Sequence, residues 1–466
     1  MDIALLFRFE IIVALLIFGL IAGALFDFGM KAKPFVVTMN IVLFVAFLIG
    51  LLPIQEGQFF TGFFQSNGLI VLQKNIVNLG ILLISLASYN WLIKSDERLE
   101  FYVLMLCTIL GVYLMLSSGN ILMLYLGIEM SSIPVAAMSN LNLKDKRSFE
   151  AGNKLILSSS FSTGVMLFGI SLLYGMVGDL SFTHVEATLS ENPFTILAFV
   201  LILSGFAFKM SIVPFHLWTA DVYEGSPVAV TNFLSVISKG SVVFIFLTVL
   251  YSLFGKLEQE WLYAISILSI LSMTIGNLFA LRQTNAKRFL AFSSIAQVGF
   301  VLVGIAGVSA VSITSVVYFI LIYLLSNVAA FGVVGAINDT TGSESLDKFK
   351  GLYKSNPFLA LVMAIALFSL AGIPPVAGFF GKLFLLAAGF KSGIYFLLAI
   401  AGVNLVFSLY NYLRVVKYMF IDESNEPLEK IQSGTALKIA LYACLIGLLV
   451  LSFSGPFFNY IYGLAS

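Results

Sequence analysis

Three lysines, Lys209, Lys239 and Lys382, lie inside long apolar segments, several turns from the nearest loop. A charged side chain in the hydrocarbon core of a bilayer costs at least about 2.5–3.5 kcal/mol, so such residues are rare and usually functional. Glu129 adds a carboxylate in another apolar segment. We infer from these four residues that the chain moves ions or protons through itself.

The composition indicates an all-α polytopic membrane protein. The chain has 466 residues, of which 60% are hydrophobic and 11% are charged, whereas a soluble domain carries about 25% charged residues. The net charge of +1 gives no indication of a nucleic-acid partner, and the lipid bilayer is the expected surrounding. With only two cysteines (Cys107, Cys444) and two histidines (His184, His216), the sequence predicts no metal or haem site.

The apolar segments predict a single membrane domain over 1–466. A membrane-spanning helix needs roughly 20 mainly apolar residues, and no junction is long enough for a soluble domain. We expect three N-terminal spans in 1–100, a five-helix unit in 101–254, a second in 260–420 and a final span in 436–466. The fourteen expected spans are 4–26, 35–53, 69–93, 101–117, 119–140, 153–177, 194–221, 228–254, 260–281, 288–308, 311–337, 357–390, 394–420 and 436–462.

The lysines and arginines predict the orientation of these spans. Most of them, Lys287 included, fall in junctions on one side, which the positive-inside rule makes cytoplasmic. The opposite face is expected to hold only Arg8, Lys74, Lys256 and Lys391. We therefore expect both termini on the outer face.

Two of the expected spans are interrupted by proline. Pro214 lies within span seven, and Pro374 and Pro375 lie within span twelve between Gly372 and Gly378. Proline removes a backbone donor and clashes with the preceding turn, and broken helices at membrane depth must be buried in protein or line a wet cavity. Matched breaks five spans apart predict two repeats, spans 4–8 and 9–13. Because five is odd, the repeats must be inverted.

The charged residues lie at a similar depth. Glu129 is about ten residues into span five, ~15 Å deep at 1.5 Å per residue, and Lys239 is equally deep in span eight. Burial disfavours a charged lysine whereas a nearby carboxylate favours it, so we expect a proton-exchanging pair of Glu129 and Lys209. The alternative is a set of structural ion pairs, which three lysines and one carboxylate would leave unbalanced. His216 could relay protons or only cap and pack, and Asp221 and Glu224 are expected to order the inner loop.

Three segments resemble the antiporter-like subunits of respiratory complex I. They are 208–227 (FKMSIVPFHLWTADVYEGSP), 283–299 (QTNAKRFLAFSSIAQVG) and 370–382 (LAGIPPVAGFFGK). The match covers nearly the whole chain. Within this family, the sequence DVYEG at 221–225, the sequence SKG around Lys239 and the lysine at 382 favour the N branch. Fourteen spans favour a bacterial chain in the inner membrane.

The resemblance implies specific roles. Glu129 and Lys209 would be the coupling pair, Lys239 the central relay and Lys382 the terminal lysine. Relatives often carry histidine where this chain has Gln297, which cannot hold a proton charge, so that step would be carried by water. NADH, FMN, iron–sulfur clusters and quinone would belong to partner subunits. This chain would bind no cofactor and would contact an adjacent antiporter-like subunit and small membrane subunits.

Three functions compete for this sequence. The first is proton translocation in NADH:quinone oxidoreductase, the second is a subunit of a multi-protein sodium/proton antiporter, and the third is a scaffold that has lost transport. The complete lysine set argues against the scaffold. The apolar segments hold no cluster of carboxylates that could coordinate a cation at mid-depth, which weakens the antiporter reading.

Overall fold

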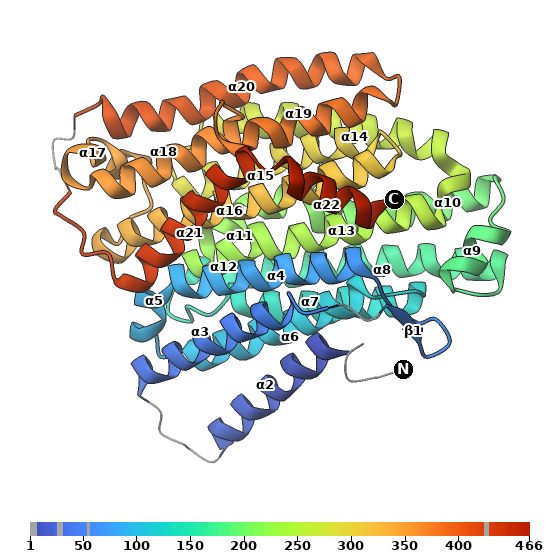
Figure 1. The fold of residues 1–466 in the computed structure, drawn as a ribbon, viewed down its shortest axis with the longest axis horizontal. Helices are drawn as coiled ribbons and strands as arrows, with labels where there is room; N and C mark the ends of the chain where they lie inside the picture. Colours follow the sequence, from blue (N-terminus) through green and yellow to red (C-terminus); the bar gives the residue numbers. More distant parts are fainter. Residues whose placement is uncertain (1–6, 26–30, 54–55, 424–427) are drawn as a thin grey trace.

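The computed structural model describes residues 7–25, 31–53, 56–423 and 428–466. In these residues the fold is helical, apart from one two-stranded hairpin. Figure 1 shows the helices running roughly side by side along the long axis of the molecule. The predicted all-α class is therefore confirmed.

The first two of the N-terminal helices lie at one edge of the bundle, and the third lies inward of them, against its centre (Figure 1). They are α2 (Arg8–Leu25), α3 (Ala32–Ile49), α4 (Gly68–Ala87) and the short α5 (Tyr89–Lys94). Between α3 and α4 lies a hairpin that the sequence analysis did not predict, made of β1 (Gly57–Phe59) and antiparallel β2 (Phe64–Ser66). The hairpin is hydrogen-bonded to the backbone of residues 117–119, because Gln65 N donates to Ser117 O and Gly119 N donates to Phe63 O, both at 2.8 Å.

The next helices cover the first expected five-helix unit. They are α6 (Arg98–Leu116), α7 (Ile121–Ser139), α8 (Lys146–Val177), α9 (Phe182–Thr188), α10 (Pro193–Met210), α11 (Leu217–Gly225), α12 (Val228–Phe233), the π-helical turn η1 (Leu234–Ser238), α13 (Lys239–Thr248), the π-helical turn η2 (Val249–Leu253) and the 3₁₀ turn η3 (Gly255–Leu257). From α12 to η2 the chain forms a single helix, Val228–Leu253, in which the π turns η1 and η2 replace two of the α-helical turns.

The remaining helices cover the second unit and the C-terminal segment. They are α14 (Glu258–Ala280), α15 (Ala286–Ile305), α16 (Ala310–Thr341), the 3₁₀ turn η4 (Leu346–Phe349), α17 (Leu352–Ser355), α18 (Pro357–Ala371), α19 (Ala377–Phe390), α20 (Tyr395–Phe420), α21 (Thr435–Ser452) and α22 (Gly455–Ala465).

Twelve helices of the described residues are long and apolar enough to cross a membrane. Span seven, expected at 194–221, divides into α10 and α11, and span twelve, expected at 357–390, divides into the shorter apolar helices α18 and α19. Span fourteen, expected at 436–462, divides into α21 and α22. The first expected span, 4–26, lies partly outside the described residues; α2 covers the rest and is not among the twelve.

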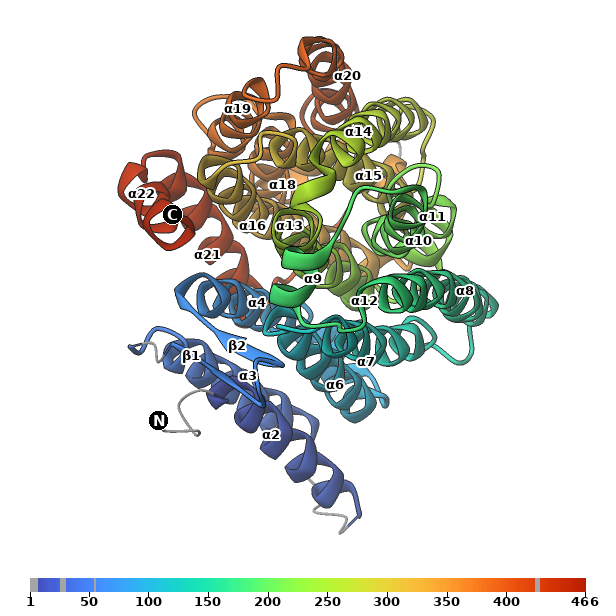
Figure 2. The same ribbon diagram turned by 90° about the vertical axis from the view of Figure 1, so that its right-hand side faces the viewer.

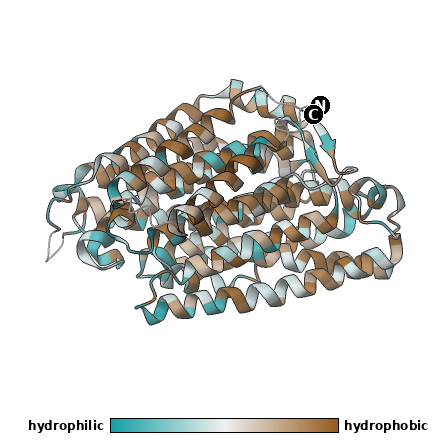
Figure 3. Cartoon of the chain, turned by 90° about the horizontal axis from the view of Figure 1, so that it is seen from below, coloured by the Kyte–Doolittle hydropathy of each residue, from teal (hydrophilic) through white to brown (hydrophobic). Residues whose placement is uncertain are grey.

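Three segments form the centre of the bundle. The α12–η2 helix is 89% buried over its apolar window, and α15 and α16 are each 94% buried. Viewed end-on in Figure 2, α13, α15 and α16 lie inside a ring of helices that includes α8, α10, α14, α20 and α21. Figure 3 shows hydrophobic colour along most helix lengths and hydrophilic colour gathered largely at their ends, as a membrane environment requires.

Candidate functional site

The break in span seven begins where α10 ends at Met210. Ser211 takes the left-handed conformation, with φ of 60°, and Ile212 N donates back to Ala207 O at 2.8 Å. Trp218 Nε1 donates to Phe208 O at 3.1 Å. The backbone carbonyls at this helix end are therefore satisfied within the protein, as membrane depth demands.

The break in span twelve has the same local geometry. Gly372 takes the left-handed conformation with φ of 86°, and Ile373 N donates to Phe368 O at 3.0 Å, again five residues back. The Val213–Pro214 and Pro374–Pro375 peptides are both cis. The structure thus places a helix break at each predicted proline site.

Lys209 lies at the end of α10, half-buried, and is held by two serines. Its ammonium donates to Ser132 on α7 and to Ser159 on α8, the second at 2.8 Å. The predicted partner Glu129 is near enough to interact electrostatically, but no ion pair within 4.0 Å joins these two described residues. Glu129 instead interacts with the hydroxyl of Tyr125, one turn earlier on α7. The structure therefore does not bring the expected pair of Glu129 and Lys209 into direct contact; two serine hydroxyls accept from the Lys209 ammonium instead.

Lys239 begins α13 directly after the π turn η1 and is 2% exposed. Its ammonium donates to Ser294 Oγ on α15 at 2.6 Å and lies 5.1 Å from the centre of the Tyr223 ring. A π turn inserts one extra residue and rotates the side chains that follow it. The sequence analysis did not predict this turn, which directs Lys239 toward α15.

His216 follows Lys209 by seven residues in the sequence. It precedes α11 and is 8% exposed, with Nδ1 making no hydrogen bond to the described protein atoms. It is close enough to Lys239 to interact electrostatically. Its position is therefore compatible with a relay, which was one of the two roles left open by the sequence.

Lys382 lies on α19 and is 3% exposed. Its ammonium donates to Ala371 O at the end of α18 at 3.3 Å and lies 4.6 Å from the centre of the Phe300 ring. Gln297, on α15, donates from Nε2 to the neighbouring carbonyl, Leu370 O, at 2.8 Å. Both residues thus donate to backbone carbonyls at the end of α18, where span twelve breaks.

Buried hydroxyls between Lys239 and Lys382 were missed by the sequence analysis. Tyr323 and Ser326 lie on α16 and Ser294 on α15; all three are buried. The Tyr323 hydroxyl lies beside Ser294, and Ser326 Oγ is 2.8 Å from Ser369 Oγ near the end of α18. The only sequence signal was the presence of serine and tyrosine inside apolar helices, which is too common to single out four positions.

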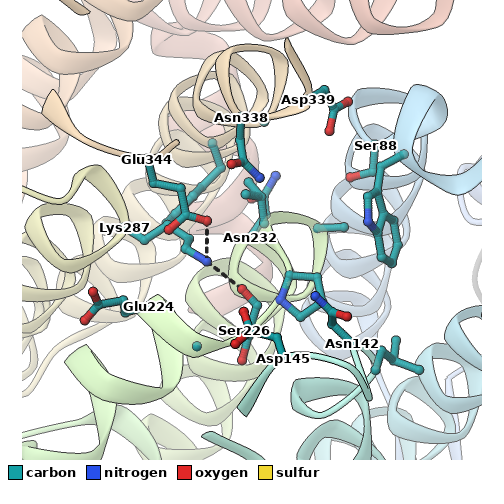
Figure 4. Close-up of a pocket in the computed structure, with 18 of the residues that line it drawn as sticks. Ser88, Asn142, Asp145, Glu224, Ser226, Asn232, Lys287, Asn338, Asp339 and Glu344 are labelled. Atoms are coloured by element: carbon teal, nitrogen blue, oxygen red, sulfur yellow. Dashed lines mark hydrogen bonds and ion pairs between the residues drawn. The ribbon is translucent and has the colours of Figure 1, made fainter. Parts of the chain in front are cut away.

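A cavity of about 760 Å³ opens on the side of the molecule expected to face the cytoplasm. Figure 4 shows its polar lining, with Lys287 between Glu344 and Ser226. Lys287 Nζ is 2.6 Å from both Glu344 Oε1 and Ser226 O. Lys287 was expected in a junction on the cytoplasmic side. Its side chain is only 2% exposed, because Glu344 and Ser226 in the cavity wall bind its ammonium. Asn232 on α12, two turns before Lys239, also lines the cavity.

The position of Lys74 also differs from the one that the sequence predicted. The sequence placed it on the outer face, but it lies in α4 with 1% exposure and pairs with Glu10 of α2 at 2.5 Å. The rings of Phe64 and Tyr113 lie 5.0 and 5.7 Å from its ammonium. Hydropathy could not reveal this pair, because Glu10 lies two spans before its partner.

Asp221 and Glu224 both bind Arg288. Arg288 NH1 is 2.8 Å from Asp221 and 2.7 Å from Glu224, and Lys154 is 2.8 Å from Asp221. These contacts join α8, α11 and α15 at the inner end of the bundle. In the described parts of the chain, no group of three or more His, Cys, Asp or Glu side chains could hold a metal ion.

Comparison with known proteins identifies the family of this architecture. Residues 118–408 match the model of the NADH:quinone oxidoreductase/Mrp antiporter transmembrane family. The chain belongs to this family. The predicted resemblance is therefore confirmed, and the matched segment contains all four candidate residues, Glu129, Lys209, Lys239 and Lys382.

Two relatives of this family carry the same name. NADH-quinone oxidoreductase subunit N of Phocaeicola vulgatus is 43% identical over 415 residues, which cover 88% of both chains. The protein of that name from Azobacteroides pseudotrichonymphae is 44% identical over 411 residues, covering 87% of this chain and 85% of the relative. The predicted N branch is confirmed by these relatives.

Solved structures of the family share the fold. A chain of respiratory complex I from Thermus thermophilus aligns with a TM-score of 0.80 and 29% identity, covering 95% of this chain and 96% of that one. A chain of the Mrp complex from Dietzia aligns with a TM-score of 0.88 at 20% identity, covering 100% and 97% of the two chains, which shows the fold alone.

Proposed function

We propose that this chain is a proton-translocating membrane subunit of NADH:quinone oxidoreductase. The family and the relatives named subunit N support this function. The observation that carries it is a run of lysines deep in the bundle, Lys209, Lys239 and Lys382, each bound to hydroxyls or free carbonyls. A lysine bound in this way can gain or lose a proton without leaving a carboxylate unpaired.

The proposed path begins at the inner cavity. Asn232 lines this cavity and precedes Lys239 by seven residues on the same continuous helix, a rise of about 10 Å. Water in the cavity would supply protons to Lys239, and His216 and Lys209 would store a proton on the side of Glu129. Charge on Lys209 and Glu129 then biases the charge on Lys239, since like charges disfavour one another at short range.

The proposed membrane arrangement follows the sequence pattern. Fourteen spans, with spans 4–8 and 9–13 as inverted repeats, would place the two broken helices on opposite sides of Lys239. The matched hydrogen bonds at Ile212 and Ile373 support this relation. Both termini would lie on the outer face of a bacterial inner membrane. NADH oxidation and quinone reduction would take place in partner subunits, with other membrane subunits covering the half-buried Lys209 side.

A sodium/proton antiporter subunit is the second candidate. The family description includes Mrp antiporters. Lys239 and Lys382 contact aromatic rings, a hydroxyl and a carbonyl, and no ion pair of the described residues brings a carboxylate to either. A sodium ion needs oxygen ligands without a competing ammonium, so the geometry favours protons.

The test is Lys239→Met in the assembled complex. Methionine keeps the length and volume of the side chain but cannot carry a proton. We expect proton pumping driven by NADH in inverted vesicles to fall to background while the complex remains assembled. Wild-type pumping at equal assembly would overturn the proton path, and pumping that requires sodium would favour the antiporter. A Lys391→Met variant, in the α19–α20 junction, is the matched control and should pump normally.

A further inference from the structure

The last turn of α18 is contacted at three consecutive residues by three different helices. Ser326 of α16 hydrogen-bonds with Ser369 Oγ at 2.8 Å. Gln297 of α15 and Lys382 of α19 donate to the next two carbonyls, Leu370 O and Ala371 O. A proton travelling from Lys239 to Lys382 therefore reaches this turn either beside Gln297 or beside Ser326.

On the route beside Gln297, the amide nitrogen of Gln297 can act only as a hydrogen-bond donor. Leu370 O can only accept, so the amide atom that faces it is the NH₂ nitrogen. The second N–H of that nitrogen points to Tyr412 OH at 2.9 Å, which must accept it. Tyr412 OH also hydrogen-bonds with Ser293 Oγ, 2.5 Å away, and either hydroxyl can be the donor there.

This direction blocks proton transfer through the amide. Hopping along hydrogen bonds requires each group to accept one proton and release another. A neutral amide nitrogen has no free acceptor site and does not lose its proton near neutral pH. The Tyr412–Gln297 branch is therefore closed, although its atoms lie within hydrogen-bond distance of one another.

The α16 side consists of hydroxyls. Lys239 donates to Ser294 Oγ at 2.6 Å, and the Tyr323 hydroxyl lies beside Ser294 without a hydrogen bond of its own to the described protein atoms. Ser294 Oγ also donates to Ala291 O at 2.7 Å and Ser326 Oγ to Ile322 O at 2.8 Å, but a hydroxyl, unlike an amide nitrogen, can rotate from such a carbonyl to pass its proton to another acceptor. Ser326 follows Tyr323 by three residues, so both side chains lie on one face of α16. Each hydroxyl both donates and accepts, and one bridging water spans a gap of one helical turn.

We propose that Tyr323 and Ser326 of α16 carry the proton from Lys239 toward Lys382, and that Gln297 is a positioning residue that closes the parallel branch through Tyr412. The inference rests on the proposed proton function and names the residues of one step within it. The Lys239 ammonium releases a proton, each hydroxyl accepts one and passes on another, and the neutral Lys382 amine becomes an ammonium.

The experiment compares two buried phenols. Tyr323→Phe and Tyr412→Phe each remove one oxygen without changing volume, and both side chains are at most 4% exposed. In vesicles with equal amounts of assembled complex, we expect Tyr323→Phe to lower the rate of NADH-driven proton pumping on the order of tenfold. Tyr412→Phe should pump at the wild-type rate. Ser326→Ala is the alternative if Tyr323→Phe fails to assemble.

A rescue experiment tests Gln297 itself. An imidazole accepts and donates protons, so Gln297→His should open the closed branch. Pumping should return in the double variant Tyr323→Phe, Gln297→His and be lost again when Tyr412→Phe is added. Equal defects in the two single phenylalanine variants, or no rescue by histidine, would overturn the assignment. A Lys382→Met variant that pumps normally would instead overturn the proposed function, which keeps the two failures apart.

Discussion

Lys209 donates to Ser132 rather than to Glu129, although Ser132 follows Glu129 by only three residues on α7. The ammonium and the carboxylate interact through space, without contact. The carboxylate can therefore change its charge without breaking a bond to the lysine. We therefore expect Glu129 to modulate the charge on Lys209.

The separation predicts a weak coupling between these residues. No ion pair within 4.0 Å joins the two side chains, and a Coulomb interaction weakens as the distance and the effective dielectric constant rise. Glu129→Gln and Lys209→Met should therefore give nearly additive losses in the yield of assembled complex. Glu10→Gln and Lys74→Met form the matched comparison, because that pair is in contact at 2.5 Å. Each single change there strands a buried charge, at a cost of about 3–5 kcal/mol, and the double change should restore assembly. The same restoration for Glu129 and Lys209 would show direct contact.

Ser294 should be required for pumping and dispensable for assembly. Among the described residues it is the hydroxyl that accepts from Lys239, and removal of a single hydrogen-bond partner of a charged group costs about 1.5–3 kcal/mol. We expect Ser294→Ala to lower the rate of NADH-driven pumping several-fold. Ser315→Ala serves as the control: this buried hydroxyl donates to Val311 O of its own helix, as Ser294 does to Ala291 O, but among the described residues no lysine donates to it. Equal pumping by both variants would remove Ser294 from the path.

Gly378 allows the close approach of α19 to the end of α18. A Cβ atom at this position would lie 1.8 Å from Ser369 O. Overpacking of a well-packed interior costs typically about 1–3 kcal/mol, so Gly378→Ala should reduce both assembled complex and pumping. Gly402→Ala on α20 is the matched control, since nothing lies within 4 Å of its added Cβ. A normal yield of the Gly378 variant would show that the break can relax.

The orientation can be tested by cysteine labelling. In a variant without Cys107 and Cys444, a cysteine at Asn142, which is exposed at the inner cavity, should react only with reagent on the cytoplasmic side. A cysteine at the exposed Glu191 should react only from outside. In right-side-out vesicles only the cysteine at 191 should react with an impermeant reagent, and in inverted vesicles only the cysteine at 142. The reverse result would place the cavity on the outer side and so contradict its assignment to proton entry.

Hydropathy and proline predicted the helices and both breaks, because these features depend on local sequence. The division at Pro214 and at Pro374–Pro375 needed no tertiary information. The span expected at 119–140 was also correct, since Asn120 accepts from Leu122 N and so begins α7.

The partners of the charged residues could not be predicted in this way. Lys74, Lys287 and Lys209 each meet groups from other spans: Glu10, Glu344 and a serine pair. Such pairing depends on helix packing across the bundle. The π turn before Lys239 was equally hidden, because a one-residue register change leaves no mark in the pattern of a helix that is apolar all round.

The contact between Glu10 and Lys74 bears on how the chain enters the membrane. Neither α2 nor α4 can rest in lipid alone without exposing an uncompensated charge. The carboxylate of the first helix must therefore stay in a protein-lined or hydrated site until the third helix has been synthesised. We therefore expect the N-terminal helices to leave the insertion machinery as one unit, so that the biogenesis of the subunit begins with their joint release.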